Sequence, residues 1–334
     1  MSRLEELESK VASGDPGARF LLAKSLLSGS EGALDPARAA ELLLVSCNEG
    51  NADASELIAA LEAMGAGRLQ SWARALHYLV LAAEQGSQSA RSQLLLLAND
   101  NDGSVGNASD WNVVGQAIDV DRLTSAPERR SLCEDPRIRV LDGFATPAEC
   151  RWLIARARGR LGPAMVFNRV TGDFARDAGR SNSAVELSTV EMDVVTEIVR
   201  SRIGKATNLP VPVFEPPHIL HYSVGQEFKP HFDFLDPANQ AYAGLLDEFG
   251  QRIATFLFYL NDDYEGGETE FPTIGLSHKG RAGDALLFAN VDRSNQPDAK
   301  TLHAGRAPTS GEKWIFSQWI RDRAPGVLPP GKGA

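Results

Sequence analysis

The chain has 334 residues, of which 43% are hydrophobic and 23% are charged, a composition typical of a globular protein with room for two domains. Its formal net charge of −10 disfavours a nucleic-acid partner, because phosphate backbones repel an acidic chain. The sequence has no apolar leader and no run approaching the roughly 18 apolar residues that span a bilayer, so we expect no membrane partner. Its three cysteines, Cys47, Cys133 and Cys150, are scattered and predict no disulfide framework, which favours a cytoplasmic location.

The first hundred residues repeat themselves with a period of 36 residues. Gly14-Asp-Pro-Gly-Ala18 returns as Gly50-Asn-Ala-Asp-Ala54 and again as Gly86-Ser-Gln-Ser-Ala90. Self-similarity at this length is typical of stacked helical hairpins, and small Ala and Gly side chains let neighbouring helices approach closely. We therefore predict an α-helical repeat domain over residues 1–98. It resembles the tetratricopeptide-like repeats, in the short Ala/Gly-rich form that ends in Ala82-Ala-Glu-Gln-Gly86.

Two interpretations of this repeat domain remain open from its sequence. A solenoid offers a concave surface that could bind a peptide or a protein partner. The same helices could instead serve only for packing or dimerisation, since a repeat architecture does not name its ligand.

A segment of turn-forming residues with almost no apolar content follows at 99–110. We predict a linker over 99–130, in which 111–130 could be a connecting helix or an edge segment. A second domain is expected over 131–323, and a flexible tail over 324–334.

The second domain begins with one strand and two helices and then becomes mostly β. Residues 137–141 have a strand pattern, and Thr146, Pro147 and Glu149 are typical of a helix start. A further helix is expected around 185–203. Strands are then predicted at 219–223, 228–234, 252–260, 285–288 and 314–320. Many short strands separated by turn residues indicate a sandwich or jelly roll.

His231 and Asp233 are the strongest candidates for a metal site. Residues i and i+2 of a strand face the same side, so the two side chains should point together into the β domain. His303, from a distant strand, would complete the two histidines and one carboxylate that hold iron(II) on one face. His218 and His221 are less favoured as metal ligands, and either could instead support a ligand from behind or belong to the core. His278 is expected in an exposed turn.

The sequence around these residues resembles the catalytic core of the prolyl 4-hydroxylase family of iron(II)/2-oxoglutarate dioxygenases. Five segments carry the resemblance, in the order of that family: Tyr222-Ser-Val-Gly-Gln-Glu-Phe-Lys-Pro-His231-Phe-Asp233, Arg252-Ile-Ala-Thr255-Phe-Leu-Phe-Tyr-Leu-Asn-Asp262, Gly266-Gly-Glu-Thr-Glu-Phe-Pro272, Gly283-Asp-Ala-Leu-Leu-Phe288, and His303 followed by Gly311-Glu-Lys313-Trp314. Together with an opening strand and helix, the similarity covers roughly 131–323.

The resemblance implies a fold and a set of site residues. The fold is α+β, with a double-stranded β-helix, or jelly-roll, catalytic domain preceded by the α-helical repeat domain. His231, Asp233 and His303 bind iron(II), and Lys313 pairs with the distal carboxylate of 2-oxoglutarate. Hydroxyls of Tyr222 and Thr255 donate to that same carboxylate, although strand packing is the other interpretation of both residues.

Arg180 lies in a segment that resembles the substrate entrance of the family. We expect it to contact substrate, and the alternative is a solvated loop arginine.

The implied reaction hydroxylates a C–H bond with Fe(II), 2-oxoglutarate and O2, releases succinate and CO2, and uses ascorbate as reductant. The expected substrate is a prolyl residue in a peptide or protein recruited by the repeat. The alternatives are a hydroxylase of a free amino acid or another small molecule, and a non-catalytic repeat scaffold or sensor.

Overall fold

The computed structural model describes residues 2–29, 34–98, 110–164, 166–167, 174–175 and 179–324. The chain forms two compact units. The first comprises Met1–Ser125 and Leu187–Arg202, and the second comprises Ala126–Glu186 and Ile203–Ala334. The first part of the predicted linker (99–109) and almost all of the predicted tail (325–334) lie outside the described residues.

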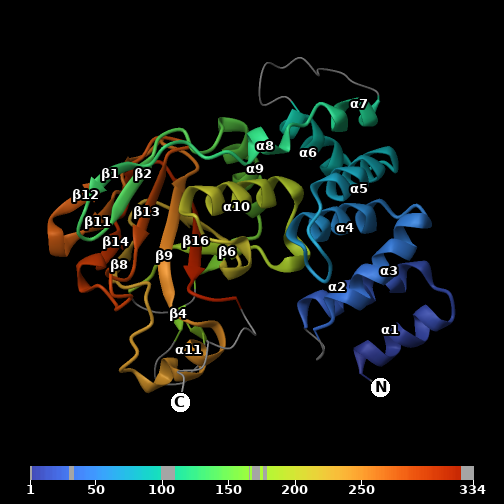
Figure 1. Ribbon diagram of the computed structural model, residues 1–334, viewed down its shortest axis with the longest axis horizontal. Coiled ribbons are helices and arrows are strands. Elements are labelled where there is room, and N and C mark those ends of the chain that lie inside the picture. Colours follow the sequence, from blue (N-terminus) through green and yellow to red (C-terminus); the bar gives the residue numbers. More distant parts are fainter. Residues whose placement is uncertain are drawn as a thin grey trace. The chain divides into compact units, whose positions relative to one another are not determined.

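Six helices of nearly equal length begin the first unit and follow one another as neighbours (Figure 1). They are α1 (Arg3–Ala12), α2 (Pro16–Ser28), α3 (Pro36–Asn48), α4 (Ala52–Met64), α5 (Trp72–Glu84) and α6 (Gln88–Ala98). Helices α2, α4 and α6 start one sequence period apart, and so do α3 and α5. The expected helical N-terminal region is therefore confirmed, while its assignment to the tetratricopeptide-like class stays a prediction.

Two contacts occupy equivalent positions one sequence period apart. Arg19 forms an ion pair with Glu49, and one period later Ser55 Oγ donates to Gln85 Oε1 at 2.6 Å. Alanines and leucines such as Leu43 fill the core between these helices. Small side chains at these buried positions allow the close helix packing that the sequence predicted.

A segment from the middle of the sequence completes the first unit. Val190, in η1 (Thr189–Glu191), packs against the helical core, and the backbone N–H of Val194 donates to Gln93 Oε1 at 3.0 Å. Arg202 Nε donates to the Leu123 carbonyl at 2.8 Å. The division between the units passes through α10 (Val194–Thr207), so part of the predicted second domain groups with the helices. The predicted domain limits themselves stay a prediction.

The ambiguous stretch 111–130 holds two short helices. It contains α7 (Trp111–Gln116) and α8 (Val120–Leu123) and ends at the first residue of β1.

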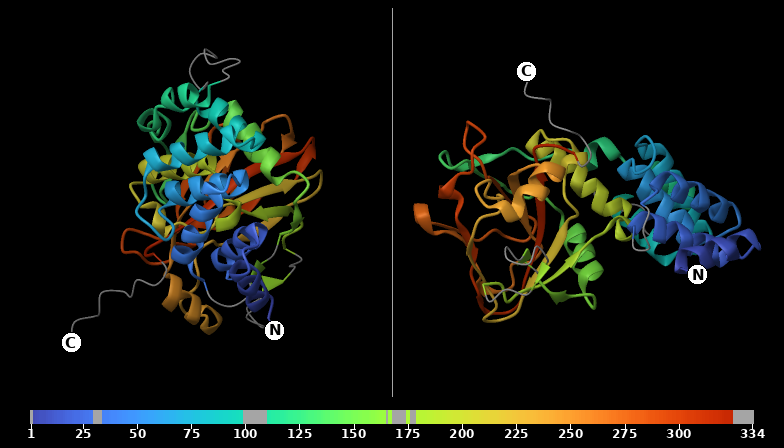
Figure 2. Two further views of the ribbon diagram at one scale, coloured as in Figure 1. Left: turned by 90° about the vertical axis from the view of Figure 1, so that its right-hand side faces the viewer. Right: turned by 90° about the horizontal axis from the view of Figure 1, so that it is seen from below.

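The second unit contains two large antiparallel sheets, as expected for a jelly roll, and two small two-stranded ones, β10 (Glu265–Gly266) with β15 (Pro308–Ser310) and β4 (Val166–Phe167) with β5 (Phe174–Ala175). The larger sheet has the strand order β1 (Arg130–Cys133), β2 (Ile138–Leu141), β13 (Ala285–Ala289), β9 (Arg252–Tyr259), β16 (Lys313–Arg321), β7 (His218–Tyr222), β6 (Ser183–Glu186) and β3 (Gly162–Pro163). The smaller has the order β12 (Leu276–His278), β11 (Thr269–Phe271), β14 (His303–Gly305) and β8 (Phe228–His231). Figure 2 shows the strands of this unit arranged around a common interior.

Shorter elements connect these strands. They are α9 (Pro147–Ala157), β4 (Val166–Phe167), β5 (Phe174–Ala175), η2 (Val211–Val213), η3 (Gln240–Tyr242), α11 (Ala243–Phe249), β10 (Glu265–Gly266), η4 (Pro272–Ile274), η5 (Ala299–Thr301) and β15 (Pro308–Ser310). The predicted start of α9 is confirmed, since Thr146 and Glu149 cap it reciprocally at 3.2 and 2.8 Å.

Aromatic side chains fill the space between the two sheets. Phe271 of the smaller sheet meets Phe288 of the larger sheet edge to face, with ring centroids 5.2 Å apart. Tyr259, Leu286 and Ile315 extend the same buried cluster. Inward-facing positions on both sheets thus form one core, against which the site residues are held.

Two predicted elements differ from the observed ones. The helix expected around 185–203 is replaced by the end of β6, then η1, and then α10, because Ser183–Glu186 pairs with β7 instead. The strand expected at 228–234 stops at His231, where its pairing with β14 ends. Asp233 therefore lies just beyond the strand rather than on it.

Candidate active site

The three predicted ligands converge at one end of the smaller sheet. Strands β8 and β14 pair in a register that places His231 directly opposite His303, and their rings lie 4.3 Å apart. Asp233 follows two residues after His231, with Oδ1 at 3.6 Å from His231 Nε2 and Oδ2 at 3.5 Å from His303 Nε2. One potential ligand atom from each residue lies within 4.8 Å of the others. The arrangement brings together the donor atoms of a metal site.

Both histidines are oriented by the backbone. His231 Nδ1 lies 2.8 Å from the carbonyl oxygen of Lys229, and His303 Nδ1 lies 3.0 Å from that of Thr301. A carbonyl only accepts, so each Nδ1 carries the proton and donates it. Each Nε2 is then left with a lone pair, which is the usual arrangement for histidines that ligate a metal.

Electrostatics keeps the ligand atoms in the state that a cation requires. Burial alone would raise the pKa of Asp233, but His303, His231 and the Thr255 hydroxyl hold that pKa well below its usual range. Burial, helped by His231, lowers the pKa of His303 to about 4. At neutral pH the site therefore offers a carboxylate and a neutral imidazole. One hard oxygen with two imidazole nitrogens fits iron(II).

A pocket adjoins the three ligands. It is lined by Arg180, Leu220, Tyr222, Phe228, His231, Asp233, Leu257, Thr269, His303, Ala304, Gly305, Lys313, Ile315, Ser317 and Trp319. Strands from both sheets contribute to this lining, so the pocket lies between the two layers of the fold.

Lys313 places a buried amino group in this pocket. Its side chain is only 1% exposed, and Nζ lies 4.9 Å from the centre of the Tyr222 ring. Within the part of the chain that the structure describes, no carboxylate lies within ion-pairing distance of Nζ. Burial lowers the pKa of Lys313 to about 7. A ligand with a carboxylate would supply the missing counter-charge.

Tyr222 lies beside Lys313 because the two residues are paired across β7 and β16. Burial raises the pKa of Tyr222 to about 12, so its hydroxyl remains a hydrogen-bond donor at neutral pH. Gly305 leaves space for this hydroxyl, since a Cβ at that position would lie 3.1 Å from it.

Thr255 occupies a different place from the one that the resemblance implied. Its hydroxyl donates to Asp233 Oδ2 at 2.6 Å, and Thr255 is absent from the pocket lining. Thr269 lines the pocket with Lys313 and Tyr222, and its Oγ1 lies 3.1 Å from the Tyr259 hydroxyl. Sequence analysis did not name Thr269 as a site residue. The signal for it is its place in the Gly266–Pro272 segment, which carries part of the family resemblance.

Arg180 is a wall of the pocket rather than a solvated loop residue. It is 9% exposed, its guanidinium lies 4.5 Å from the Phe228 ring centre, and its Nε donates to Asn182 Oδ1 at 3.1 Å. Its expected contact with substrate stays a prediction.

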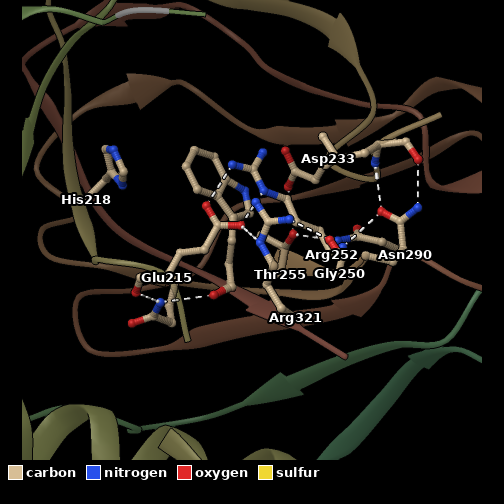
Figure 3. Close-up of polar contacts among 12 residues, drawn as sticks. Glu215, His218, Asp233, Gly250, Arg252, Thr255, Asn290 and Arg321 are labelled. Atoms are coloured by element: carbon tan, nitrogen blue, oxygen red, sulfur yellow. Dashed lines mark hydrogen bonds and ion pairs between the residues drawn. The ribbon is translucent and has the colours of Figure 1, made fainter. Parts of the chain in front are cut away.

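The sequence analysis did not identify a buried charged cluster formed by Glu215, Arg252 and Arg321 (Figure 3). Glu215 receives two hydrogen bonds from Arg252, at 2.6 and 2.7 Å, and one from Arg321 at 2.6 Å. Arg252 in turn lies 4.0 Å over the Trp319 ring, which lines the pocket. Burial opposes the charge on Glu215, but the two arginines lower its pKa. These residues lie far apart in the sequence, so no local pattern could have identified the cluster.

The other histidines of this unit lie outside the ligand set. His218 faces Glu186 at 3.4 Å, and His221 faces Glu312 at 3.3 Å. His278 belongs to β12 and is half-buried, so the exposed turn expected for it is wrong.

Comparisons with known proteins agree with this geometry. Residues 217–321 match the 2OG-Fe(II) oxygenase superfamily. Prolyl 4-hydroxylase 1 of Arabidopsis thaliana is 37% identical over 204 residues, which cover 57% of this chain and 70% of the relative. Probable prolyl 4-hydroxylase 7 of the same plant is 33% identical over 234 residues, covering 64% and 72%. The 2OG complex of a viral collagen prolyl hydroxylase from Paramecium Bursaria Chlorella virus-1 is 27% identical, with a TM-score of 0.43, and the match covers 57% of this chain and 98% of that one.

Removing any one of the three ligands should abolish metal binding. We expect His231→Ala, Asp233→Ala and His303→Ala to be purified folded, without bound iron, and to form no succinate from 2-oxoglutarate. His221→Ala is the matched control, because His221 faces Glu312 instead of the site. Metal content and succinate formation are the measurements, and wild-type turnover in any of the first three variants would contradict the assignment.

Replacing Lys313 with methionine keeps most of its volume but removes its charge. A bound carboxylate would then be buried without a partner, at a cost of about 3–5 kcal/mol. The affinity for 2-oxoglutarate should fall by roughly two to three orders of magnitude. Equilibrium dialysis measures this directly. Lys300→Met, at an exposed lysine paired with Asp135, is the control, and a loss smaller than about fivefold in Lys313→Met would contradict the role.

The affinity for 2-oxoglutarate should also depend on pH. Below a pKa of about 7, Lys313 is already protonated and ready to pair with a carboxylate. Above it, the free protein must take up a proton in order to bind, so the dissociation constant should rise by up to about tenfold per pH unit. Titrations between pH 6 and pH 9 test this. Lys313→Arg should remove the dependence, because arginine stays charged throughout.

Proposed function

The chain belongs to the prolyl 4-hydroxylase family of 2OG-Fe(II) oxygenases, and from this premise we propose that it hydroxylates a prolyl residue in a peptide or protein. Hydroxylation is coupled to the oxidative decarboxylation of 2-oxoglutarate, which yields succinate and CO2. The enzyme is a 2-oxoglutarate-dependent dioxygenase that uses Fe(II) and O2.

One observation carries this proposal: the three ligands and a buried, unpaired lysine share one pocket. The ligand atoms of His231, Asp233 and His303 lie within 4.8 Å of one another. Lys313 lines the same pocket with its charge uncompensated by any carboxylate at ion-pairing distance in the described chain. A co-substrate with a metal-binding 2-oxo acid at one end and a carboxylate at the other satisfies both features.

The residues have distinct tasks in this reaction. His231, Asp233 and His303 would hold the metal through two imidazole nitrogens and one carboxylate oxygen. Bound iron(II), together with the 2-oxo acid and O2, supplies the oxidant that inserts oxygen into a C–H bond. Lys313 holds the distal carboxylate of the co-substrate, with donors from the hydroxyls of Tyr222 and Thr269.

Apolar side chains surround the proposed contact between Lys313 and the carboxylate. Leu220, Leu257 and Ile315 line the pocket beside the polar residues and exclude water from the carboxylate. In such surroundings the interaction between the ammonium group and the carboxylate is stronger than it would be in water.

We propose that the substrate chain lies against the Arg180 side of the pocket. The guanidinium of Arg180 and the ring of Phe228 form one wall, and the Trp319 ring adds an aromatic surface. Aromatic faces suit the apolar ring of proline, and a guanidinium donates to peptide carbonyls. The intact ligand set and Lys313 argue against a non-catalytic scaffold.

Three further proposals concern the reductant, the location and the first unit. Ascorbate as reductant rests on the family resemblance, and a cytoplasmic location rests on three free cysteines. Recruitment of the polypeptide by the first unit rests on its stacked helices, whose alternative role is packing. No helix among the described residues is long and apolar enough to cross a membrane.

The decisive experiment compares substrate classes with the full-length protein. With iron and 2-oxoglutarate supplied, proline-containing peptides should gain one oxygen atom on proline, as measured by fragmentation mass spectrometry, with one succinate formed for each oxygen added. Asp233→Ala should give neither product. Oxidation of free amino acids or other small molecules alone would establish the small-molecule alternative, and oxidation that proceeds without 2-oxoglutarate would contradict the reaction class.

A further inference from the structure

Two buried polar residues lie behind the metal-binding carboxylate and do not touch the pocket. Thr255, in the middle of β9, is 1% exposed, and Asn290, directly after β13, is fully buried. They are linked in series to Asp233 (Figure 3): Asn290 Nδ2 lies 3.0 Å from Thr255 Oγ1, which lies 2.6 Å from Asp233 Oδ2.

The direction of these hydrogen bonds follows from chemistry. An ionised carboxylate can only accept, so the single proton of the Thr255 hydroxyl must point at Asp233. The hydroxyl oxygen is then free to accept, and the amide nitrogen of Asn290 donates to it. Asn290 therefore fixes the rotation of the Thr255 hydroxyl, and Thr255 fixes the plane of the Asp233 carboxylate.

The backbone holds Asn290 in place on both sides. Its N–H donates to the Ile253 carbonyl at 2.8 Å, which extends the β9–β13 ladder, and its carbonyl accepts from the N–H of Asp298 at 3.1 Å. The amide group thus starts from a rigid position at the end of a central strand.

The same segment also orients a second ligand. The hydroxyl of Thr301 donates to the Asp298 carbonyl at 2.7 Å, and the Thr301 carbonyl accepts from His303 Nδ1 at 3.0 Å. One stretch of chain, from Asn290 to His303, therefore sets the orientation of both Asp233 and His303.

We propose that Thr255 and Asn290 are positioning residues that act in series to hold Asp233 in its metal-binding orientation. The inference rests on the metal site of the proposed function, but not on the identity of the substrate. It replaces the co-substrate contact that the sequence resemblance implied for Thr255. Partners behind metal ligands typically contribute about 10- to 100-fold in metal affinity.

The two roles of Thr255 predict different defects in Thr255→Val, which keeps the shape of the side chain and loses its hydroxyl. A positioning role weakens binding of the metal alone. We expect the dissociation constant for Co(II), a spectroscopic probe insensitive to oxygen, to rise by about 10- to 100-fold. At saturating iron, the KM for 2-oxoglutarate should stay within about twofold. A co-substrate contact predicts the reverse pattern.

Asn290 provides a second test, because it acts only through the Thr255 hydroxyl. Asn290→Ala should weaken Co(II) binding in the wild-type background and have no further effect in Thr255→Val. Additive losses would overturn the series arrangement. Circular dichroism and thermal melting of the metal-free proteins establish that each variant is folded.

Two control variants complete the design. Thr255→Ser restores the hydroxyl and should recover Co(II) affinity to within about threefold of wild type. Thr196→Val removes a buried threonine hydroxyl that has no hydrogen-bond partner in the described structure, and it should leave Co(II) binding unchanged. Unchanged Co(II) affinity in folded Thr255→Val, or a raised 2-oxoglutarate KM alone, would overturn the proposal.

Failure of the proposed function gives a different result. If wild type binds Co(II) and Thr255→Val does not, while no proline peptide is oxidised, the positioning role stands and the substrate assignment fails. If wild type binds no Co(II), the metal site and the positioning role fail together.

Discussion

The pairing of β8 with β14 is the constraint on which the site depends. Its register sets His231 opposite His303, so two ligands meet although they lie far apart in the sequence. Asp233 joins them because β8 ends at His231. The Asp233 carboxylate then accepts a hydrogen bond from the Thr255 hydroxyl on β9. A shift of one residue in this register would turn the His231 side chain to the opposite face of the sheet. The metal site is therefore a property of strand pairing, and the jelly roll is what enforces that pairing.

The pocket balances two buried charges that do not neutralise each other. Asp233 stays ionised because histidines and a hydroxyl surround it, whereas burial depresses the pKa of Lys313 to about 7. A buried cation without a partner is unfavourable in the free protein. A metal ion bound beside Asp233 and a carboxylate bound beside Lys313 would compensate both buried charges together. The unfavourable state of the empty pocket thus favours a ligand that carries both groups.

The sequence was most informative where chemistry depends on a short motif. The His231-Phe-Asp233 motif, the distant His303 and Lys313 were all predicted, and the structure brings them to one pocket. The sequence was least informative about which threonine hydroxyl, that of Thr255 or that of Thr269, lies in the pocket. Thr255 and Thr269 both lie in β strands of recognisable segments, and only the pairing of the strands decides which of them faces the pocket. The Glu215 cluster combines residues from two strands, β9 and β16, with one from a loop, so spacing alone does not indicate it.

The grouping of Leu187–Arg202 with the first unit has no signal in the sequence for a related reason. The period of the first helices was readable, since α2, α4 and α6 keep the spacing of the repeat. The segment Leu187–Arg202 carries no trace of that period, yet it packs with those helices through Val190, Val194 and Arg202. On either side of it the chain belongs to the second unit. Deleting the N-terminal helices would therefore expose the apolar side chains of Leu187–Arg202 that pack against them. This segment cannot be deleted as well, because it connects two parts of the second unit. Any role of these helices in substrate recruitment is consequently better separated from folding by surface substitutions than by truncation.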